Sequence, residues 1–134
     1  MPFTILLVED DLDVREALAE TLRDEGYVVD ATADGLEALQ YLQAGHQPGL
    51  ILLDLMMPRM SGSEFRMAQL KDPALSHFPV VLLSADGRMR EKAAALQTAG
   101  AVRKPIDLRE LLRIIAGFRD APRTPSPPSP RPTL

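Results

Sequence analysis

Short aliphatic runs alternate along the chain with longer segments in which apolar residues recur at helical spacing. The first run, Ile5 to Val8, is apolar throughout, which is typical of a strand buried between helices on both faces. Apolar side chains then recur three and four positions apart between Val14 and Leu22, and Gly26 follows, as at the end of an amphipathic helix. Repeated along the chain, this alternation predicts βα units around a parallel sheet.

The same patterns predict five strands and five helices, a (βα)₅ arrangement. Strands are expected at residues 4–8, 27–31, 50–53, 79–83 and 101–103, and helices at residues 11–25, 36–45, 63–70, 88–99 and 107–118. Asp11 and Asp107 are expected to cap the first and last helices. Right-handed crossovers with one reversal of winding bring the first and third strands side by side. The expected fold class is therefore α/β, with a doubly wound five-stranded parallel sheet.

Composition changes abruptly at residue 119. Residues 119–134 contain six of the twelve prolines and almost nothing apolar, so this segment cannot bury enough surface to offset the entropy of ordering it. We therefore expect one folded domain at residues 1–118, followed by a proline-rich disordered tail at residues 119–134. The tail carries +2, from three arginines and one aspartate, so the total of −4 leaves −6 on the folded domain.

Composition also excludes several classes of function. The 134 residues contain no cysteine, which removes disulfides, thiolate metal sites and cysteine nucleophiles and fits a reducing, cytoplasmic location. The longest apolar runs are far too short to span a bilayer, so no membrane association is expected. The net charge of −4 argues against a general electrostatic interaction with nucleic acid.

Polar side chains follow four of the five predicted strands. Glu9 and Asp10 follow the first, Asp54 the third, Ser84 ends the fourth and Lys104 follows the fifth. Open α/β sheets bind ligands at the carboxyl ends of their strands. Three carboxylates in one crevice repel one another unless cations intervene or a proton is taken up, and such oxygen ligands suit Mg²⁺ or Mn²⁺. With Lys104 added, the set predicts a site for a phosphoryl group.

In order and position, these residues resemble the receiver domain of two-component response regulators. The resemblance extends over residues 4–118 and rests on Glu9-Asp10, Asp54 within Leu53 to Pro58, Ser84-Ala85 and Lys104-Pro105. It implies a flavodoxin-like fold with strand order 2-1-3-4-5 and a cis bond between Lys104 and Pro105.

The resemblance also implies a role for each site residue. Asp54 would be the phosphoacceptor. Asp10 and Asp54 would bind the metal directly, Glu9 would bind it through water, and the backbone carbonyl of Met56 would complete the protein ligands. Ser84 would donate its hydroxyl to one phosphoryl oxygen, and Lys104 would pair with another.

The function implied is a phosphorylation-dependent signalling switch or phosphorelay shuttle, not an enzyme in the ordinary sense. Asp54 would take a phosphoryl group from a phosphohistidine on a histidine kinase or phosphotransfer protein. Ser84 would then bias the loop and helix after the fourth strand. We expect a stand-alone receiver, monomeric or weakly dimeric. Its downstream protein target would bind the face formed by the fourth helix, fifth strand and fifth helix.

The chain departs from the family three positions before the lysine, where an aromatic residue is common and Ala101 stands instead. The connection from Gly100 to Lys104 is also short, so we expect a truncated or shifted fifth strand. The phosphorylation signal would then be read out differently, through Arg88 and Arg90 of the fourth helix and the loop before Lys104.

Two alternatives stay open. A degenerate receiver would act only as a protein-docking module, without phosphorylation. A Mg²⁺-dependent phosphatase with an aspartyl intermediate, as in haloacid-dehalogenase-like enzymes, would need an aspartate two places after the nucleophile, where this chain has Met56. His46 and His77 lie in different loops without the spacing of metal ligands, and we expect both to be exposed.

Overall fold

A computed structural model describes residues 2–57 and 59–121 of the chain. Five parallel strands form one sheet in the order β2-β1-β3-β4-β5. The strands are β1 (Thr4–Val8), β2 (Val28–Thr32), β3 (Leu50–Asp54), β4 (Val80–Ser84) and β5 (Gly100–Arg103). The predicted flavodoxin-like fold and its strand order are thus confirmed. Since β1 lies between β2 and β3, the residues that follow β1 and β3 emerge next to each other.

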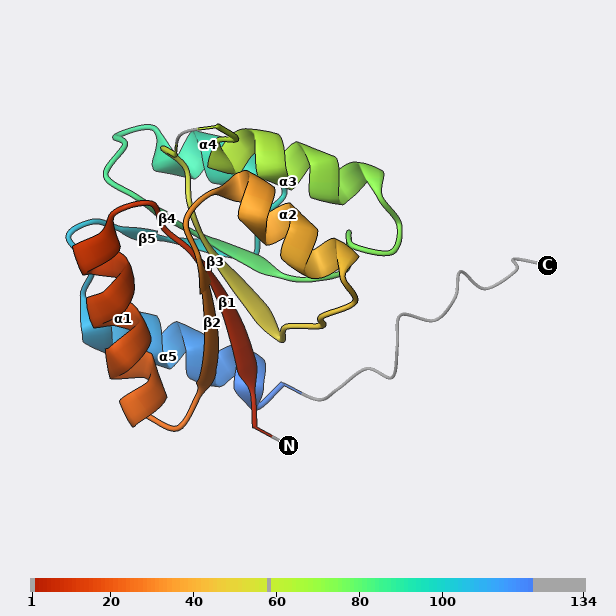
Figure 1. Cartoon of the computed structure of the whole chain (residues 1–134). Helices are drawn as coiled ribbons and strands as arrows, with labels where there is room; N and C mark the ends of the chain where they lie inside the picture. The colour runs from red at the N-terminus through yellow and green to blue at the C-terminus, as the bar shows by residue number, and fades with distance from the viewer. Residues whose placement is uncertain (1, 58, 122–134) are drawn as a thin grey trace.

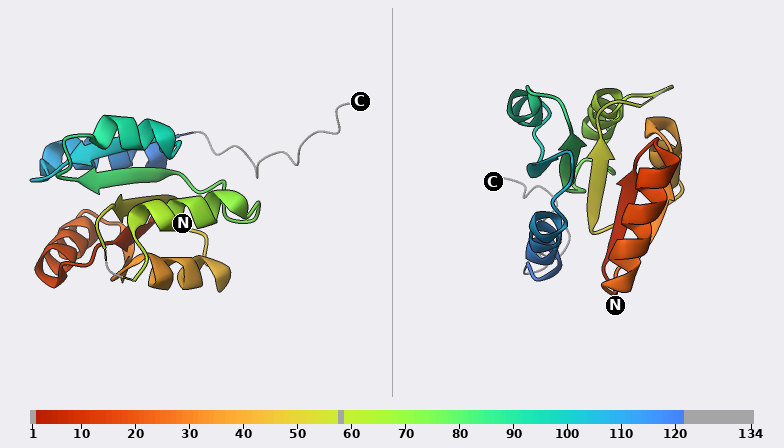
Figure 2. Two further views of the ribbon diagram at one scale, coloured as in Figure 1. Left: turned by 90° about the horizontal axis from the view of Figure 1, so that it is seen from above. Right: turned by 90° about the vertical axis from the view of Figure 1, so that its left-hand side faces the viewer.

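Five helices cover the two faces of the sheet. They are α1 (Leu12–Asp24), α2 (Gly35–Gln43), α3 (Gly62–Lys71), α4 (Met89–Ala95) and α5 (Leu108–Arg119). Helices α1 and α5 cover one face, and α2, α3 and α4 cover the other (Figure 1). Figure 2 shows the same elements from two further directions. Within the described ranges, no helix is long and apolar enough to cross a bilayer.

Two apolar clusters, one on each face, hold the sheet between its helices. Leu7 and Leu52 belong to the cluster under α1 and α5, while Leu6 and Leu53 belong to the cluster under α2, α3 and α4. All four side chains are fully buried, and burying one leucine stabilises the fold by about 2 kcal/mol. The strand ends that carry the polar residues are therefore fixed on a rigid base.

Side-chain caps fix where four of the helices begin. The carboxylate of Asp11 accepts a hydrogen bond from the N–H of Val14, and that of Asp107 accepts hydrogen bonds from the first turn of α5. Both predicted caps are confirmed. Asp34 caps α2 in the same way, and Ser61 forms a reciprocal capping box with Glu64 at the start of α3. These caps also fix the course of the loops that enter each helix.

The fourth helix is shorter than predicted. It ends at Ala95, not at Ala99, because Gln97 adopts a left-handed backbone conformation with φ 55°. Two interactions stabilise this ending. The N–H groups of Gln97 and Thr98 bond back to the carbonyls of Ala94 and Ala93, the pattern of a Schellman motif. From α3, the buried guanidinium of Arg66 donates to the carbonyls of Leu96 and Gln97, at 2.9 and 2.8 Å.

The C-terminal part of the described chain also differs in detail from the expectation. Strand β5 has four residues where the other strands have five, so it is truncated as expected, but it is not shifted, because it pairs in continuous register with β4 from Val81↔Gly100 to Ser84↔Arg103. Helix α5 extends to Arg119, one residue past the expected end of the domain, and Arg119 donates to the hydroxyl of Tyr27 at 3.1 Å. Most of the predicted tail, residues 122–134, lies outside the described residues.

Candidate functional site

Three carboxylates meet where β1 and β3 end. Val8 is paired with Leu53, so Glu9 and Asp10 after β1 lie beside Asp54 at the end of β3. One carboxylate oxygen from each lies within 4.8 Å of the others. Glu9 is 1% exposed and Asp54 is 5% exposed, while Asp10 is open to solvent. The structure thus brings together the three predicted acidic residues, two of them buried and one open to solvent, and this group of three is called the acidic hollow below.

Lys104, directly after β5, supplies a positive charge to the three carboxylates. Its Nζ lies 2.7 Å from Oε1 of Glu9 and 3.6 Å from Oδ2 of Asp54. The backbone N–H of Lys104 bonds to the carbonyl of Ser84 at 2.8 Å, and the Lys104–Pro105 bond is cis, as predicted. Burial lowers the pKa of Lys104, but Glu9 and Asp54 together raise it above the ordinary value. The ammonium therefore stays charged and pairs more closely with Glu9 than with Asp54.

The charge of Asp54 is not fully compensated by these neighbours. Burial and the nearby negative charge of Glu9 raise the pKa of Asp54 to about 7, although Lys104 and the N–H of Met56 act in the opposite direction. Without a further cation, Asp54 is therefore partly protonated near neutral pH. A divalent cation among the three carboxylates would stabilise the ionised form. An all-oxygen donor set that is open to water on one side fits Mg²⁺ or Mn²⁺.

The loop after Asp54 leaves the sheet in a tight turn. The N–H of Met56 lies 3.3 Å from Oδ1 of Asp54, and the N–H of Gly62 bonds to the carbonyl of Leu55 at 3.0 Å. A Cβ at Gly62 would lie 2.3 Å from the carbonyl oxygen of Asp54, so only glycine fits there. The hydrogen bond to Asp54 keeps the Met56 N–H beside the phosphoacceptor candidate, while Met56 as a whole is 70% exposed.

Ser84 occupies the predicted position at the end of β4. Its neighbour Leu83 is paired with Asp54 across the sheet, so Ser84 lies one residue beyond the phosphoacceptor candidate. The hydroxyl oxygen accepts a hydrogen bond from the N–H of Asp86 at 3.0 Å, and Asp86 forms an ion pair with Lys92 of α4. The hydroxyl thus connects the site to the loop that enters α4.

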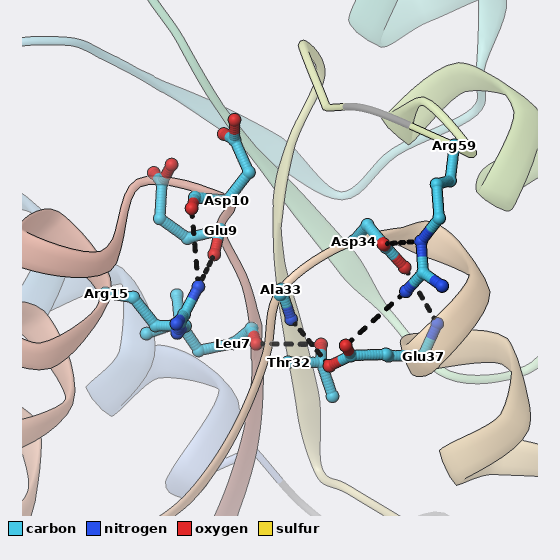
Figure 3. A network of polar contacts seen from close by, with 9 residues as sticks. All are labelled: Leu7, Glu9, Asp10, Arg15, Thr32, Ala33, Asp34, Glu37 and Arg59. Atoms are coloured by element: carbon cyan, nitrogen blue, oxygen red, sulfur yellow. Dashed lines mark hydrogen bonds and ion pairs between the residues drawn. The ribbon is translucent and has the colours of Figure 1, made fainter.

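Arg15 is a residue that the sequence patterns did not single out. From α1 its Nη1 donates to the carbonyl oxygens of Glu9 and Asp10, at 2.9 and 3.4 Å, and so fixes the backbone that presents both carboxylates (Figure 3). A basic residue near the start of a helix opposes the helix dipole. That unfavourable placement is the one sequence signal that points to it.

The remaining predictions concern residues away from the hollow. His46 is exposed and stacks on Tyr41, with ring centroids 4.2 Å apart, while His77 is exposed beside Phe78. Neither histidine belongs to the carboxylate cluster, and their predicted exposure is confirmed.

Comparison with known proteins agrees with this geometry. Residues 5–116 match the sequence pattern of the response regulator receiver domain family. The chain belongs to this family. Response regulator MprA of Mycobacterium sp. (strain KMS) is 40% identical over 134 residues, which cover 97% of this chain and 56% of MprA. This receiver domain therefore spans only about half the length of that curated relative. A receiver domain is not a conventional enzyme.

Solved structures show the same fold. Chemotaxis protein CheY4 of Vibrio cholerae is 28% identical with a TM-score of 0.79, covering 88% of this chain and 99% of its own. The receiver domain of sensor histidine kinase PA1611 from Pseudomonas aeruginosa is 27% identical with a TM-score of 0.79, covering 90% of this chain and all of its own. That structure holds a magnesium ion in its active site cleft. The acidic hollow of this receiver domain resembles such a magnesium site.

Proposed function

We propose that this receiver domain accepts a phosphoryl group on Asp54 and acts as a phosphorylation-dependent switch. The observation that carries the proposal is the meeting of Glu9, Asp10 and Asp54 within 4.8 Å, with the ammonium of Lys104 beside them. In this proposal Glu9, Asp10, Asp54 and the backbone carbonyl of Met56 hold Mg²⁺ or Mn²⁺. The ion would screen the carboxylates and the phosphoryl oxygens from each other.

The phosphoryl transfer needs Asp54 in its ionised form. A carboxylate oxygen of Asp54 forms a bond to phosphorus while the bond from phosphorus to the histidine nitrogen of the donor breaks, and the leaving imidazole takes a proton from solvent. Lys104 lies 3.6 Å from Asp54, so its ammonium can turn from Glu9 to an oxygen of the transferred group. The protein supplies position and charge in this step, which are the main requirements of phosphoryl transfer.

The donor is a histidine kinase or a phosphotransfer protein, and it must approach the open side of the hollow. An apolar depression of about 360 Å³ lies beside Lys104, lined among others by Val14, Pro105 and Leu108. Val14 and Leu108 are partly exposed, and a partner that covers them would bury apolar surface next to the phosphoacceptor. We propose that the phosphoryl donor contacts this apolar depression.

Phosphorylation would be communicated through Ser84. Its hydroxyl accepts one hydrogen bond, from Asp86, and retains its proton to donate to a phosphoryl oxygen. Movement of Ser84 toward that oxygen would pull on Asp86 and, through the ion pair with Lys92, on α4. Such a switch needs only a few kcal/mol of difference between its two states.

The downstream target would bind the face formed by α4, β5 and α5. With Ala101 in place of a large side chain, this face has a depression of about 450 Å³, lined among others by Met89, Arg90 and Arg103. Residues 86–118 contain seven basic and four acidic side chains, whereas the domain as a whole is acidic. We therefore propose an acidic protein partner for this face. Function as a stand-alone cytoplasmic protein, monomeric or weakly dimeric, stays a prediction.

The test is incubation with Mg²⁺ and acetyl phosphate, followed by intact-mass spectrometry. The proposal expects one added phosphoryl group in the wild-type protein and none in Asp54→Ala. Asp24→Ala, which removes an exposed carboxylate at the far end of α1, is the matched control and should be labelled normally. Absence of both an adduct and Mg²⁺ binding would instead support the docking module. Rapid turnover of a small phosphate ester would support the phosphatase.

A further inference from the structure

An arginine in the loop between β3 and α3 reaches a buried carboxylate outside the acidic hollow. Nε of Arg59 donates to Oδ2 of Asp34 at 2.6 Å, and its Nη2 lies 3.5 Å from Oε2 of Glu37 (Figure 3). Asp34 is 3% exposed, while the Arg59 side chain is 56% exposed. A buried carboxylate needs a charged or hydrogen-bonding partner, and Arg59 supplies it from a segment 25 residues away.

Asp34 uses its two oxygens for two different purposes. Oδ1 caps α2 by accepting the N–H of Glu37 at 3.0 Å, which leaves Oδ2 for Arg59. Glu37 is itself held, because its Oε1 accepts the N–H of Ala33 at 3.0 Å. Arg59 therefore binds a carboxylate that is held in the turn after β2, and not a mobile surface side chain.

A second contact, a backbone hydrogen bond, joins the loop between β3 and α3 to this turn. The N–H of Gly35 bonds to the carbonyl of Met60 at 3.2 Å, and a Cβ at Gly35 would lie 2.8 Å from that same oxygen. Arg59 itself, directly before Met60, adopts a left-handed backbone conformation with φ 60°. This conformation is unfavourable for a residue with a side chain and persists where surrounding contacts hold it.

These contacts hold Arg59 and Met60, which follow Met56 in the same connection between β3 and α3. One end of the loop is Asp54 at the end of β3, and the hydrogen bond from Gly62 to Leu55 closes the other end. Arg59 and Met60 hold the middle of the loop against α2. Met56 lies between Asp54 and these contacts and, being 70% exposed, contributes little to holding its own position.

We propose that Arg59 is a positioning residue for the cation site, because its ion pair with Asp34 holds the Met56 carbonyl where a divalent cation binds. The inference rests on the proposed function and adds a residue that does not itself touch the cation. Loss of groups that orient metal ligands weakens metal binding by about tenfold or more. Loss of the Arg59–Asp34 pair should therefore weaken Mg²⁺ binding in a protein that still folds, although Arg59→Ala also costs stability because Asp34 loses its charged partner.

The test compares Mg²⁺ affinities by isothermal titration calorimetry in Arg59→Ala, Asp34→Asn and the double variant, each shown by circular dichroism to be folded. Asp34→Asn keeps an oxygen that can cap α2 but removes the charge that Arg59 needs. Each single variant should bind Mg²⁺ about tenfold more weakly. The double variant should bind no more weakly than either single one, because both remove the same pair.

Two further variants separate positioning from general effects of charge. Arg59→Lys keeps the positive charge without the planar donor group, so it should recover only part of the lost affinity. Arg113→Ala removes an exposed arginine of α5 and should bind Mg²⁺ as the wild type does. Wild-type affinity in both Arg59→Ala and Asp34→Asn would overturn the inference alone. Absence of Mg²⁺ binding by the wild-type protein would instead overturn the proposed function, and the inference with it.

Discussion

Replacement of Asp54 by asparagine should stabilise the metal-free protein, although it abolishes phosphorylation. The pKa of Asp54 rises from 3.8 to about 7 in the folded state, mainly through burial and then through Glu9. Each unit corresponds to about 1.4 kcal/mol of preference for the neutral form, so ionisation costs the fold at most about 4 kcal/mol above pH 7. Relaxation and water entry reduce this cost. We expect Asp54→Asn to raise the free energy of unfolding by about 2 kcal/mol.

The sign of the pH dependence follows from the same shift. Because the pKa of Asp54 is higher in the folded state than in the unfolded state, the folded protein binds more protons between about pH 4 and pH 7. The contribution of Asp54 to the free energy of unfolding therefore falls as the pH rises through this window. Asparagine does not titrate, so the advantage of Asp54→Asn should be small at about pH 4 and complete at about pH 8.

Urea unfolding in EDTA, followed by circular dichroism, measures this difference directly. Asp24→Asn makes the same chemical change at an exposed position and should not show a comparable gain. Mg²⁺ at ten times its dissociation constant should add about 1.4 kcal/mol to the wild-type protein and much less to Asp54→Asn. The reasoning is refuted if Asp54→Asn is less stable than the wild type at about pH 8, or if the difference between them does not change with pH.

Three further predictions follow from other parts of the structure. Gly62→Ala should lower the free energy of unfolding by about 2 kcal/mol or more, because its Cβ would lie 2.3 Å from the Asp54 carbonyl; an unchanged urea midpoint would contradict the close approach. Arg66→Met should cost about 3 kcal/mol by urea unfolding, because it leaves the carbonyls of Leu96 and Gln97 without their donor; the exposed Arg113→Met is the control, and equal stability would refute the assignment. Mg²⁺ affinity, measured calorimetrically, should weaken as the pH falls below about 7, because Asp54 must lose its proton to bind the ion; a flat profile would show that Asp54 is not a ligand.

The fold was predictable because its strands are buried and parallel. Four consecutive apolar residues, such as Ile5 to Val8 and Val80 to Leu83, mark strands covered on both faces. Parallel strands end at one edge of the sheet, so the polar residues after β1, β3, β4 and β5 had to converge there. The acidic hollow and its lysine could therefore be assigned before the structure was known.

What the sequence patterns missed depends on contacts between distant segments. The sequence pattern predicts a helix that continues to Ala99, yet α4 ends at Ala95, because Gln97 adopts a left-handed conformation and Arg66 of α3 binds the terminal carbonyls. Arg59 and Asp34 are 25 residues apart, and nothing local to either indicates the other. The closer pairing of Lys104 with Glu9 than with Asp54 likewise depends on how the sheet places three side chains.

The most direct test of the central claim is to map the phosphorylated residue. After incubation with Mg²⁺ and acetyl phosphate, borohydride reduction converts an aspartyl phosphate into homoserine, which peptide mass spectrometry locates. The account predicts homoserine at position 54 in the wild-type protein, and none when EDTA replaces Mg²⁺ or when Lys104 is changed to alanine. Homoserine at another acidic residue, or labelling at position 54 that is indifferent to Mg²⁺, would contradict it.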